Sequence, residues 1–139
     1  MMKQDRAVEL SQIQRQILIL LEEAGEENLA ALTNSVGNAH DGSPQELEVV
    51  AAALTGLFAQ GLVEASTSRD VTSRHWIPEP KERARLLLAD LRPLLRWSAS
   101  EKSWRWEAAD IPRAQALLTD TGSAAAREIL AATGYPKID

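Results

Sequence analysis

The chain has 139 residues, of which 45% are hydrophobic and 25% charged, a composition that supports a folded domain with an apolar core. It contains no cysteine, which excludes disulfides, thiol catalysis and cysteine-based zinc sites. The longest apolar run, Ile17 to Leu21, is too short to cross a bilayer, and the N-terminus has no apolar core of signal-peptide type. We therefore expect a soluble, cytoplasmic protein without a membrane partner.

The net charge of −5 is unevenly distributed along the chain. The stretch from Gln16 to Ser68 contains eight acids and no lysine or arginine, whereas residues 69–113 contain ten bases and seven acids. Local charge decides an encounter with an anionic partner, so an acidic total does not exclude nucleic-acid binding. It does restrict a nucleic-acid surface to segments outside residues 16–68.

Two helices are predicted before residue 37. Ser11 and Gln14 have the spacing of a capping box, and an apolar stripe with a helical period follows them. Gly25 is expected to end this first helix. A second, weaker helix is predicted over residues 27–36, followed by a loop over residues 37–42.

The third helix has the clearest start in the chain. Ser43 is the expected cap, Pro44 takes the first helical position, and Glu46 completes a second capping box. The helix should run to about Gln60, where Gly61 terminates it.

A β-hairpin and further helices are predicted after the third helix. Residues 62–66 and 75–77 should be two short strands joined by the polar segment 68–73. A helix should begin near Lys81, and Pro93 must kink, break or restart it. Further along, we expect a short strand over residues 104–107, a helix over residues 112–118 capped by Asp110, and a last helix over residues 124–133 capped by Ser123.

Three helices followed by a β-hairpin resemble the winged helix-turn-helix superfamily, which includes regulators of the MarR and PadR type. The resemblance covers residues 11–78 and is carried by the apolar stripe Ile13 to Leu21 and by the segment Ala53 to Glu64, with its Gly-Leu-Val exit from the helix. It implies a mainly α-helical α+β fold, with a winged-helix-like domain and its β-hairpin wing over residues 1–78. Residues 79–139 should form a helical extension with a short strand, which packs on the first domain or builds a dimer.

In that superfamily the third helix usually enters the major groove, so the outward side of this helix decides the function. That side is small and apolar on a helical wheel, with Val49, Ala52, Gly56 and Ala59 between glutamines and without a cation. Bidentate readout of guanine needs arginine or lysine, and a helix that is apolar all round is usually buried. We therefore predict that these four residues form a protein interface, covered by the second half of the chain or by a second copy. The alternative is an exposed, alanine-rich helix.

Nucleic-acid binding would have to use cations elsewhere. Arg69 and Arg74 lie in the predicted wing beside hydroxyl groups, a combination that suits phosphate. A second cationic set falls within about 60° of one helical wheel, provided that the helix continues through Pro93. This set is Lys81, Arg85, Arg92 and Arg96. For both sets a solvated polar surface is the simpler interpretation, and the second set is also placed to pair with the acidic first half.

Three tryptophans, Trp97, Trp104 and Trp106, are either parts of a core or dimer interface, which we favour, or a platform for stacking bases or an aromatic ligand. Catalysis has little support, because His40 and His75 are the only histidines and neither has neighbours at ligand spacing. No glycine-rich phosphate loop follows a strand, and no serine sits in a nucleophile-elbow pattern. We expect no enzyme activity, no cofactor and no metal site.

Two functions therefore compete. The first is a non-catalytic, winged-helix-like regulatory or adaptor protein that acts by packing its third helix against protein, in a homodimer or with another partner. The second is a DNA-binding transcription regulator that uses the wing and the residue 81–96 face on phosphates. The composition of the third helix favours the first function, because that helix offers nothing to a phosphate.

Overall fold

The computed structural model describes residues 10–37, 41–68, 76–107 and 113–132. Helices account for 54% of these residues and strands for 23%, and all strand pairs are antiparallel. The predicted α+β class is confirmed. In chain order, the described elements are α1 (Gln12–Ala24), β1 (Glu26–Asn28), α2 (Leu29–Ser35), α3 (Pro44–Ala59), β2 (Val63–Ser68), β3 (Trp76–Pro78), α4 (Lys81–Ala89), β4 (Leu95–Ser98), β5 (Ser103–Trp106), β6 (Ala114–Leu118) and α5 (Asp120–Ala132).

The first helix, α1, begins and ends where its sequence predicts. The Ser11 side chain accepts a hydrogen bond from the Gln14 backbone, and the Gln14 side chain accepts one from the Ser11 backbone, so the capping box is complete. Gly25 follows the helix with a φ of 89°, a conformation that favours glycine, and its N–H donates to the Leu21 carbonyl.

The second and third helices differ from their predicted starts. Strand β1 occupies the positions predicted as the first turn of α2, and the Asn28 side chain caps α2 instead. Helix α3 begins at Pro44 as expected, but the predicted capping box is wrong because the Ser43 side chain makes no cap hydrogen bond. The Glu46 carboxylate instead accepts hydrogen bonds from the Trp104 indole and from the backbone N–H of Asp41.

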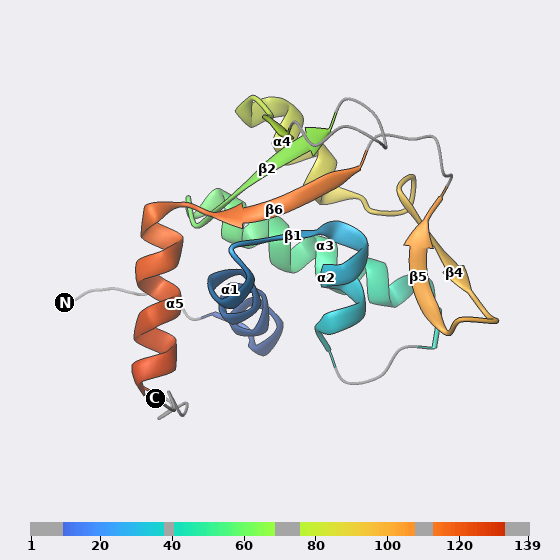
Figure 1. Ribbon diagram of the computed structural model, residues 1–139, viewed down its shortest axis with the longest axis horizontal. Coiled ribbons are helices and arrows are strands. Elements are labelled where there is room, and N and C mark those ends of the chain that lie inside the picture. Colours follow the sequence, from blue (N-terminus) through green and yellow to red (C-terminus); the bar gives the residue numbers. More distant parts are fainter. Residues whose placement is uncertain (1–9, 38–40, 69–75, 108–112, 133–139) are drawn as a thin grey trace.

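The main sheet has the strand order β1-β6-β2-β3 (Figure 1). Strand β6 lies between β1 and β2, with Ala116 paired to Glu27 on one side and to Ala65 on the other. The prediction of a helix over residues 112–118 is therefore wrong for Ala114–Leu118, because hydrogen bonds on both edges hold this segment as a strand. The sheet also crosses the boundary expected near residue 78, since β6 belongs to the second half of the chain.

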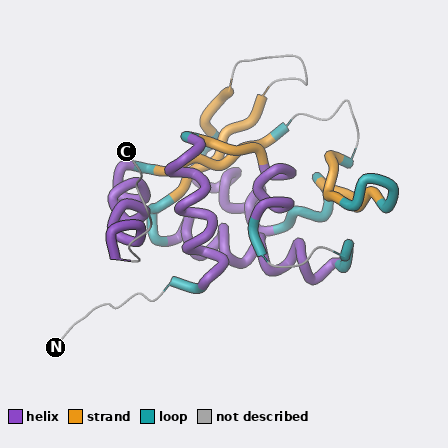
Figure 2. Tube along the Cα trace, turned by 60° about the horizontal axis from the view of Figure 1, so that its bottom comes forward, coloured by secondary structure: helices purple, strands orange, loops and turns teal. Residues whose placement is uncertain are grey.

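Helix α4 ends at Ala89, so the helix expected to continue toward residue 96 does not form. Asp90 takes an extended conformation, and its carboxylate accepts a hydrogen bond from the Arg92 backbone N–H at 3.1 Å. The proline at position 93 also disfavours a helical conformation at Arg92. The chain then enters the β4–β5 hairpin, which both views place at the end of the molecule opposite α5 (Figures 1 and 2).

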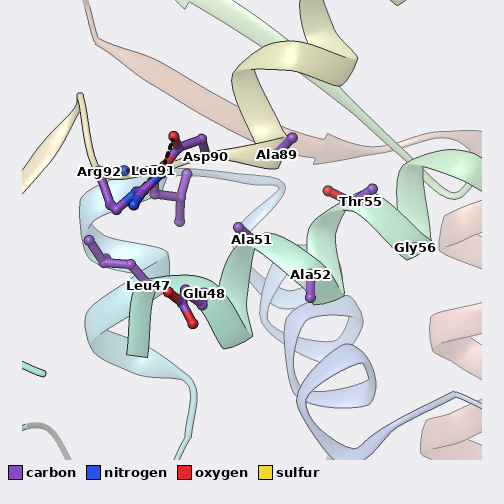
Figure 3. Close-up of a pocket in the computed structure, with 10 residues that line it drawn as sticks. All are labelled: Leu47, Glu48, Ala51, Ala52, Thr55, Gly56, Ala89, Asp90, Leu91 and Arg92. Atoms are coloured by element: carbon purple, nitrogen blue, oxygen red, sulfur yellow. Dashed lines mark hydrogen bonds and ion pairs between the residues drawn. The ribbon is translucent and has the colours of Figure 1, made fainter. Parts of the chain in front are cut away.

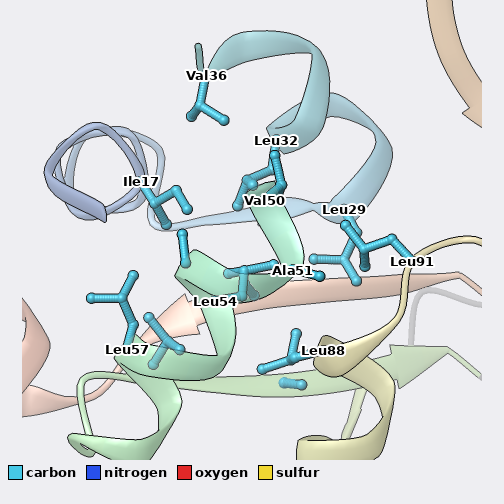
Figure 4. Packing of buried hydrophobic residues seen from close by; sticks show 14 of the residues in the cluster. Ile17, Leu29, Leu32, Val36, Val50, Ala51, Leu54, Leu57, Leu88 and Leu91 are labelled. Atoms are coloured by element: carbon cyan, nitrogen blue, oxygen red, sulfur yellow. The ribbon is translucent and has the colours of Figure 1, made fainter. Parts of the chain in front are cut away.

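The apolar core surrounds α3, which lies between α1 and α2 on one side and α4 on the other, with the main sheet behind it (Figure 4). Its fully buried members include Ile17 of α1, Leu32 of α2, Leu54 of α3 and Leu88 of α4. Each buried aliphatic side chain of this size stabilises the fold by about 1.5–3 kcal/mol, so α3 is fixed firmly along its inner side. This packing determines which side of α3 faces outward.

Candidate interaction surface

Helix α3 has a buried side and an exposed side. The buried side consists of Leu47, Val50, Ala51, Ala53, Leu54 and Leu57. The exposed positions of the helix are Pro44, Gln45, Glu48, Val49, Ala52 and Ala59, and the C-cap residue Gln60 is also exposed. Val49 is the large apolar side chain on this side and keeps 49% of its surface exposed. The exposed side has no cation and includes the acid Glu48.

The four residues of the predicted protein interface lie along this exposed side. Val49, Ala52 and Ala59 are exposed, so the described part of the second half of the chain does not cover them. Gly56 is half-buried, because the Gln14 side chain of α1 extends over it. A Cβ atom added at Gly56 would lie 2.6 Å from the Gln14 Nε2 atom, which itself donates to the Ala53 carbonyl at 3.4 Å.

Two open grooves flank the exposed side of α3, and Ala52 lines both of them. One groove, of about 650 Å³, lies between α3 and the segment that leaves α4 (Figure 3). The other, of about 730 Å³, lies between α3 and the start of α1. Ala52 therefore forms a low ridge between two hollows, a shape that accepts the side chains of a packed helix. We call these the α4 groove and the α1 groove.

The α4 groove is apolar at its base and charged at one end. Leu47, Ala51 and Leu91 are buried side chains that line it, while Glu48 and Arg92 are exposed at its margin. The Arg92 guanidinium donates to both Asp90 carboxylate oxygens, at 2.9 and 3.0 Å. These bonds and the backbone N–H of Arg92 lower the Asp90 pKa to about 2. Arg92 thus pairs with Asp90 in its own segment, and Glu48 of α3 adds a weaker attraction from across the groove.

The α1 groove is lined by a cation, whereas the charged residues that line the α4 groove have a net negative charge. Its apolar wall comes from Leu10 and Ile13, and Val49 contributes from α3. Arg15 lines the same groove, is exposed, and has no ion pair with any residue in the described ranges. The two grooves thus present an exposed acid, Glu48, on one side of the Ala52 ridge and an exposed cation on the other.

The four described residues of the predicted phosphate surface do not lie on one helix. Arg69 and Arg74 lie outside the described residues. Lys81 and Arg85 are on α4, where Arg85 is bound to Glu82 one turn away, which raises the Arg85 pKa. The other two arginines leave the helix: Arg92 follows its end and pairs with Asp90, and Arg96 belongs to β4. The predicted cationic helix face does not form, because α4 is nine residues long and ends before Arg92 and Arg96.

The tryptophans predicted as core or platform pack mainly inward. Trp104 is 4% exposed and belongs to the core cluster, and its ring meets Trp97 edge to face at a centroid distance of 5.3 Å. Its indole N–H donates to Glu46 at 2.8 Å. Trp106 is half-buried, with the Arg113 guanidinium 5.5 Å above its ring. Trp104 is therefore a core residue rather than part of a stacking surface.

Two hydrogen bonds join α2 to β5, and they could not be predicted from the sequence. The Asn34 side chain donates to the Trp104 carbonyl at 2.9 Å and accepts from the Trp104 N–H at 2.7 Å. A side-chain amide thus occupies the backbone groups that a further strand would use. Asparagine is common in loops and helix ends, so its presence at position 34 carried no signal of this role.

No family model matches the chain, and no curated protein and no solved structure is significantly similar to it. Within the described ranges, no group of three or more histidine or acidic side chains is placed to hold a metal ion. His40 and His75 lie outside those ranges. None of the helices described combines the length and apolar content that a membrane span requires. The surface around α3 is therefore the feature on which a function can be argued.

Proposed function

We propose that this chain is a non-catalytic regulatory or adaptor protein that acts by packing the exposed side of α3 against protein. The observation that supports this most is the Ala52 ridge, an exposed small residue between two grooves on a helix whose opposite side is fully buried. Small residues let a second helix approach closely, and the grooves on each side receive its larger side chains. The exposed Val49 then loses contact with water on binding.

The same surface is poorly suited to reading DNA. A helix in the major groove needs arginine, lysine, asparagine or glutamine toward the bases and cations toward the phosphates. The exposed side of α3 offers Gln45 and Gln60 at its two ends, with Glu48 between them. Arg92, the cation in the α4 groove, is bound to Asp90. These charges favour a protein partner over a nucleic acid.

The partner we propose is a second copy of this chain, because the two grooves are electrostatically complementary. Glu48 lines the α4 groove and Arg15 lines the α1 groove. A two-fold arrangement that crosses two α3 helices near Ala52 and brings unlike grooves together places Glu48 beside Arg15 of the partner subunit. Each pair occurs twice in such a dimer, because a two-fold interface is the same on both subunits.

We propose that residues 12–78 form a winged-helix-like unit. The elements that support this proposal are α1, β1, α2 and α3, followed by the antiparallel β2–β3 pair. On this proposal the helix that winged-helix proteins usually place in the major groove has no cations here and serves in dimer formation. We assign a regulatory or adaptor role because packing against protein is the interaction that the exposed side of α3 supports.

Sedimentation velocity over a range of concentrations tests this proposal. The wild-type chain of 15.2 kDa should sediment as a species of twice that mass, and Ala52→Glu should be monomeric because it places a charge on the ridge. Ala131→Glu, on the exposed side of α5, is the matched control and should remain dimeric. A wild-type monomer at all concentrations, or an unchanged Ala52→Glu dimer, would contradict the proposed dimer.

A further inference from the structure

The outward face of the β4–β5 hairpin carries two arginines directly opposite each other. Arg96 of β4 is the register partner of Arg105 of β5, and both side chains are exposed. Residues opposite each other in an antiparallel pair have Cα atoms about 4.5–5.5 Å apart, and like charges in such positions repel. A pairing of this kind lowers hairpin stability unless an anion lies between the two guanidinium groups.

Within the described residues, only one of the two arginines has an acidic partner that would relieve this repulsion. Arg105 pairs with Glu101 at the hairpin turn. Arg96 has no ion-pair partner in the described residues. The hairpin and the hydrogen bond that closes it, residues 94–107, contain three bases, including the exposed Lys102, and two acids, Glu101 and the exposed Glu107. The hairpin is therefore a local cationic surface on an acidic protein.

Hydroxyl groups extend the same face. The next pair on that face of the ladder is Ser98 opposite Ser103, two residues along each strand from the arginines. Arginine forks and serine hydroxyls are both frequent donors to phosphate oxygens. The large apolar side chains of the hairpin occupy the other face, where Trp97 and Trp104 meet.

We propose that this face binds the phosphodiester backbone of nucleic acid, without reading its bases. Its lack of large apolar side chains argues against a protein partner, because the centre of a protein interface is usually apolar. Phosphate binding requires no apolar centre and is driven by cations that displace condensed counterions. Paired guanidinium groups bind tetrahedral oxyanions through two hydrogen bonds each, which lysines cannot do.

This site is independent of the α3 surface proposed above, because its cations lie on the hairpin strands and not in either groove. The two proposals can therefore fail separately. A variant that lacks both arginines should keep the mass of the wild type in sedimentation. The ridge residue Ala52 does not contribute to the phosphate site.

Fluorescence anisotropy with a labelled DNA duplex of arbitrary sequence tests the proposal on the full chain. Two or three phosphate contacts predict that the logarithm of the binding constant falls with the logarithm of salt with a slope of about −2 to −3. Arg96→Ala with Arg105→Ala should weaken binding about tenfold or more at low salt and reduce the steepness of the slope by about 2. A second duplex of different sequence should bind equally well.

The matched control removes the same charge from another exposed surface. Lys81→Ala with Arg85→Ala should leave the affinity within about twofold, since neither residue lies on the hairpin. An equal loss in both double variants would show that net charge alone attracts DNA and would overturn the site. Displacement of the duplex by polyglutamate at an equal concentration of charge would also overturn it, in favour of an acidic protein partner.

The melting temperature measured without DNA distinguishes a phosphate-binding role of the arginines from a structural one. Because the opposed pair is repulsive, Arg96→Ala should melt at the same temperature as the wild type or higher. A clearly lower melting temperature would mean that Arg96 supports the hairpin, and a loss of DNA binding in that variant would then count against the proposal.

Discussion

The Glu46 carboxylate of α3 accepts a hydrogen bond of 2.8 Å from the indole N–H of Trp104, 58 residues away in β5. Trp104 is 4% exposed, so its N–H has little access to water and depends on this acceptor. The bond joins the first turn of the helix that carries the candidate interface to the hairpin that carries the opposed arginines. Together with the Asn34 contacts to the Trp104 backbone, it fixes the hairpin to the helical core.

Removal of this acceptor should destabilise the protein. Glu46→Ala leaves the buried indole N–H without its side-chain acceptor and should lower the free energy of unfolding by about 2 kcal/mol in chemical denaturation. Glu46→Gln retains an acceptor oxygen and should cost less. Gln45→Ala, an exposed change in the same helical turn that lies in neither groove, should stay within about 0.5 kcal/mol of wild type. Equal effects at positions 45 and 46 would show that the indole contact contributes nothing.

Two glycines in helices should respond to the same substitution to very different extents. A Cβ atom at Gly122 would lie 1.9 Å from the Leu62 backbone carbonyl oxygen, which cannot move without disturbing the end of β2. Gly122→Ala should therefore lower the free energy of unfolding by about 2–3 kcal/mol by displacing α5. At Gly56 the nearest atom is the end of the Gln14 side chain, which can move away.

Gly56→Ala is therefore the matched comparison for Gly122→Ala. Helix propensity favours alanine by about 1 kcal/mol, which offsets the displacement of Gln14, so the net change should be below about 1 kcal/mol. Thermal or chemical denaturation of both variants gives the comparison. A larger loss at Gly56 than at Gly122 would contradict the packing of α5 against the Leu62 carbonyl.

The contact between α1 and α5 should depend on pH. Ser123 Oγ donates to the Glu22 carboxylate at 2.6 Å, and Arg127 Nε donates to its other oxygen at 3.2 Å. The Ser123 hydrogen bond first, and Arg127 in addition, lower the Glu22 pKa below its ordinary value in the folded protein. Stability from this group is therefore complete above the pKa of the unfolded chain, about 4.3, and is lost as pH falls through the lower folded pKa.

Glu22→Gln tests this dependence. At neutral pH the variant should be less stable than wild type by about 1 kcal/mol, and the difference should shrink as the pH falls below about 4. Glu23→Gln, at the exposed neighbouring position, should follow the wild-type curve at every pH. A difference between Glu22→Gln and wild type that stays constant into strong acid would contradict the lowered pKa.

The complementary grooves predict a charge-reversal result. Arg15→Glu or Glu48→Arg alone brings like charges together in the proposed dimer and should weaken self-association by about 1 kcal/mol, or about fivefold in the dissociation constant. The double variant restores opposite charges and should recover most of the affinity. Sedimentation equilibrium measures all four proteins, and additive losses in the double variant would refute the pairing of unlike grooves.

Local signals in the sequence predicted several elements correctly. The Ser11 capping box and Gly25 define α1, and Pro44 begins α3, because these residues act on their own helical turn. The helix over residues 112–118 was predicted from Asp110 as a cap and from a start near Pro112, and the β6 residues, Ala-Gln-Ala-Leu-Leu, do have high helix propensity. Its strand conformation comes from pairing with β1 and β2, and such long-range contacts leave no periodic pattern in a five-residue segment.

The outward side of α3 could be predicted from the sequence, whereas the α4 groove could not. The helical period separates Val49 and Ala52 from the buried Leu54, so the outward side of α3 follows from the sequence alone. The α4 groove does not, because it depends on the early end of α4 at Ala89 and on the return of Leu91 to the core. Arg96 lies opposite Arg105 only in the observed strand register, and the sequence of a hairpin with a four-residue turn does not predict that register.

Disulfide cross-linking of Ala52→Cys tests the central claim, the packing of two α3 helices at the Ala52 ridge, most directly. The natural chain has no cysteine, so the introduced thiol is the only one. Helices that cross at small residues can bring two such positions within about 4.4–6.8 Å between Cα atoms, the range that a disulfide spans. Under mild oxidation Ala52→Cys should form a covalent dimer rapidly, whereas Ala131→Cys on α5 should remain monomeric in denaturing electrophoresis. A failure of Ala52→Cys to cross-link, or equal cross-linking at both positions, would contradict the claim.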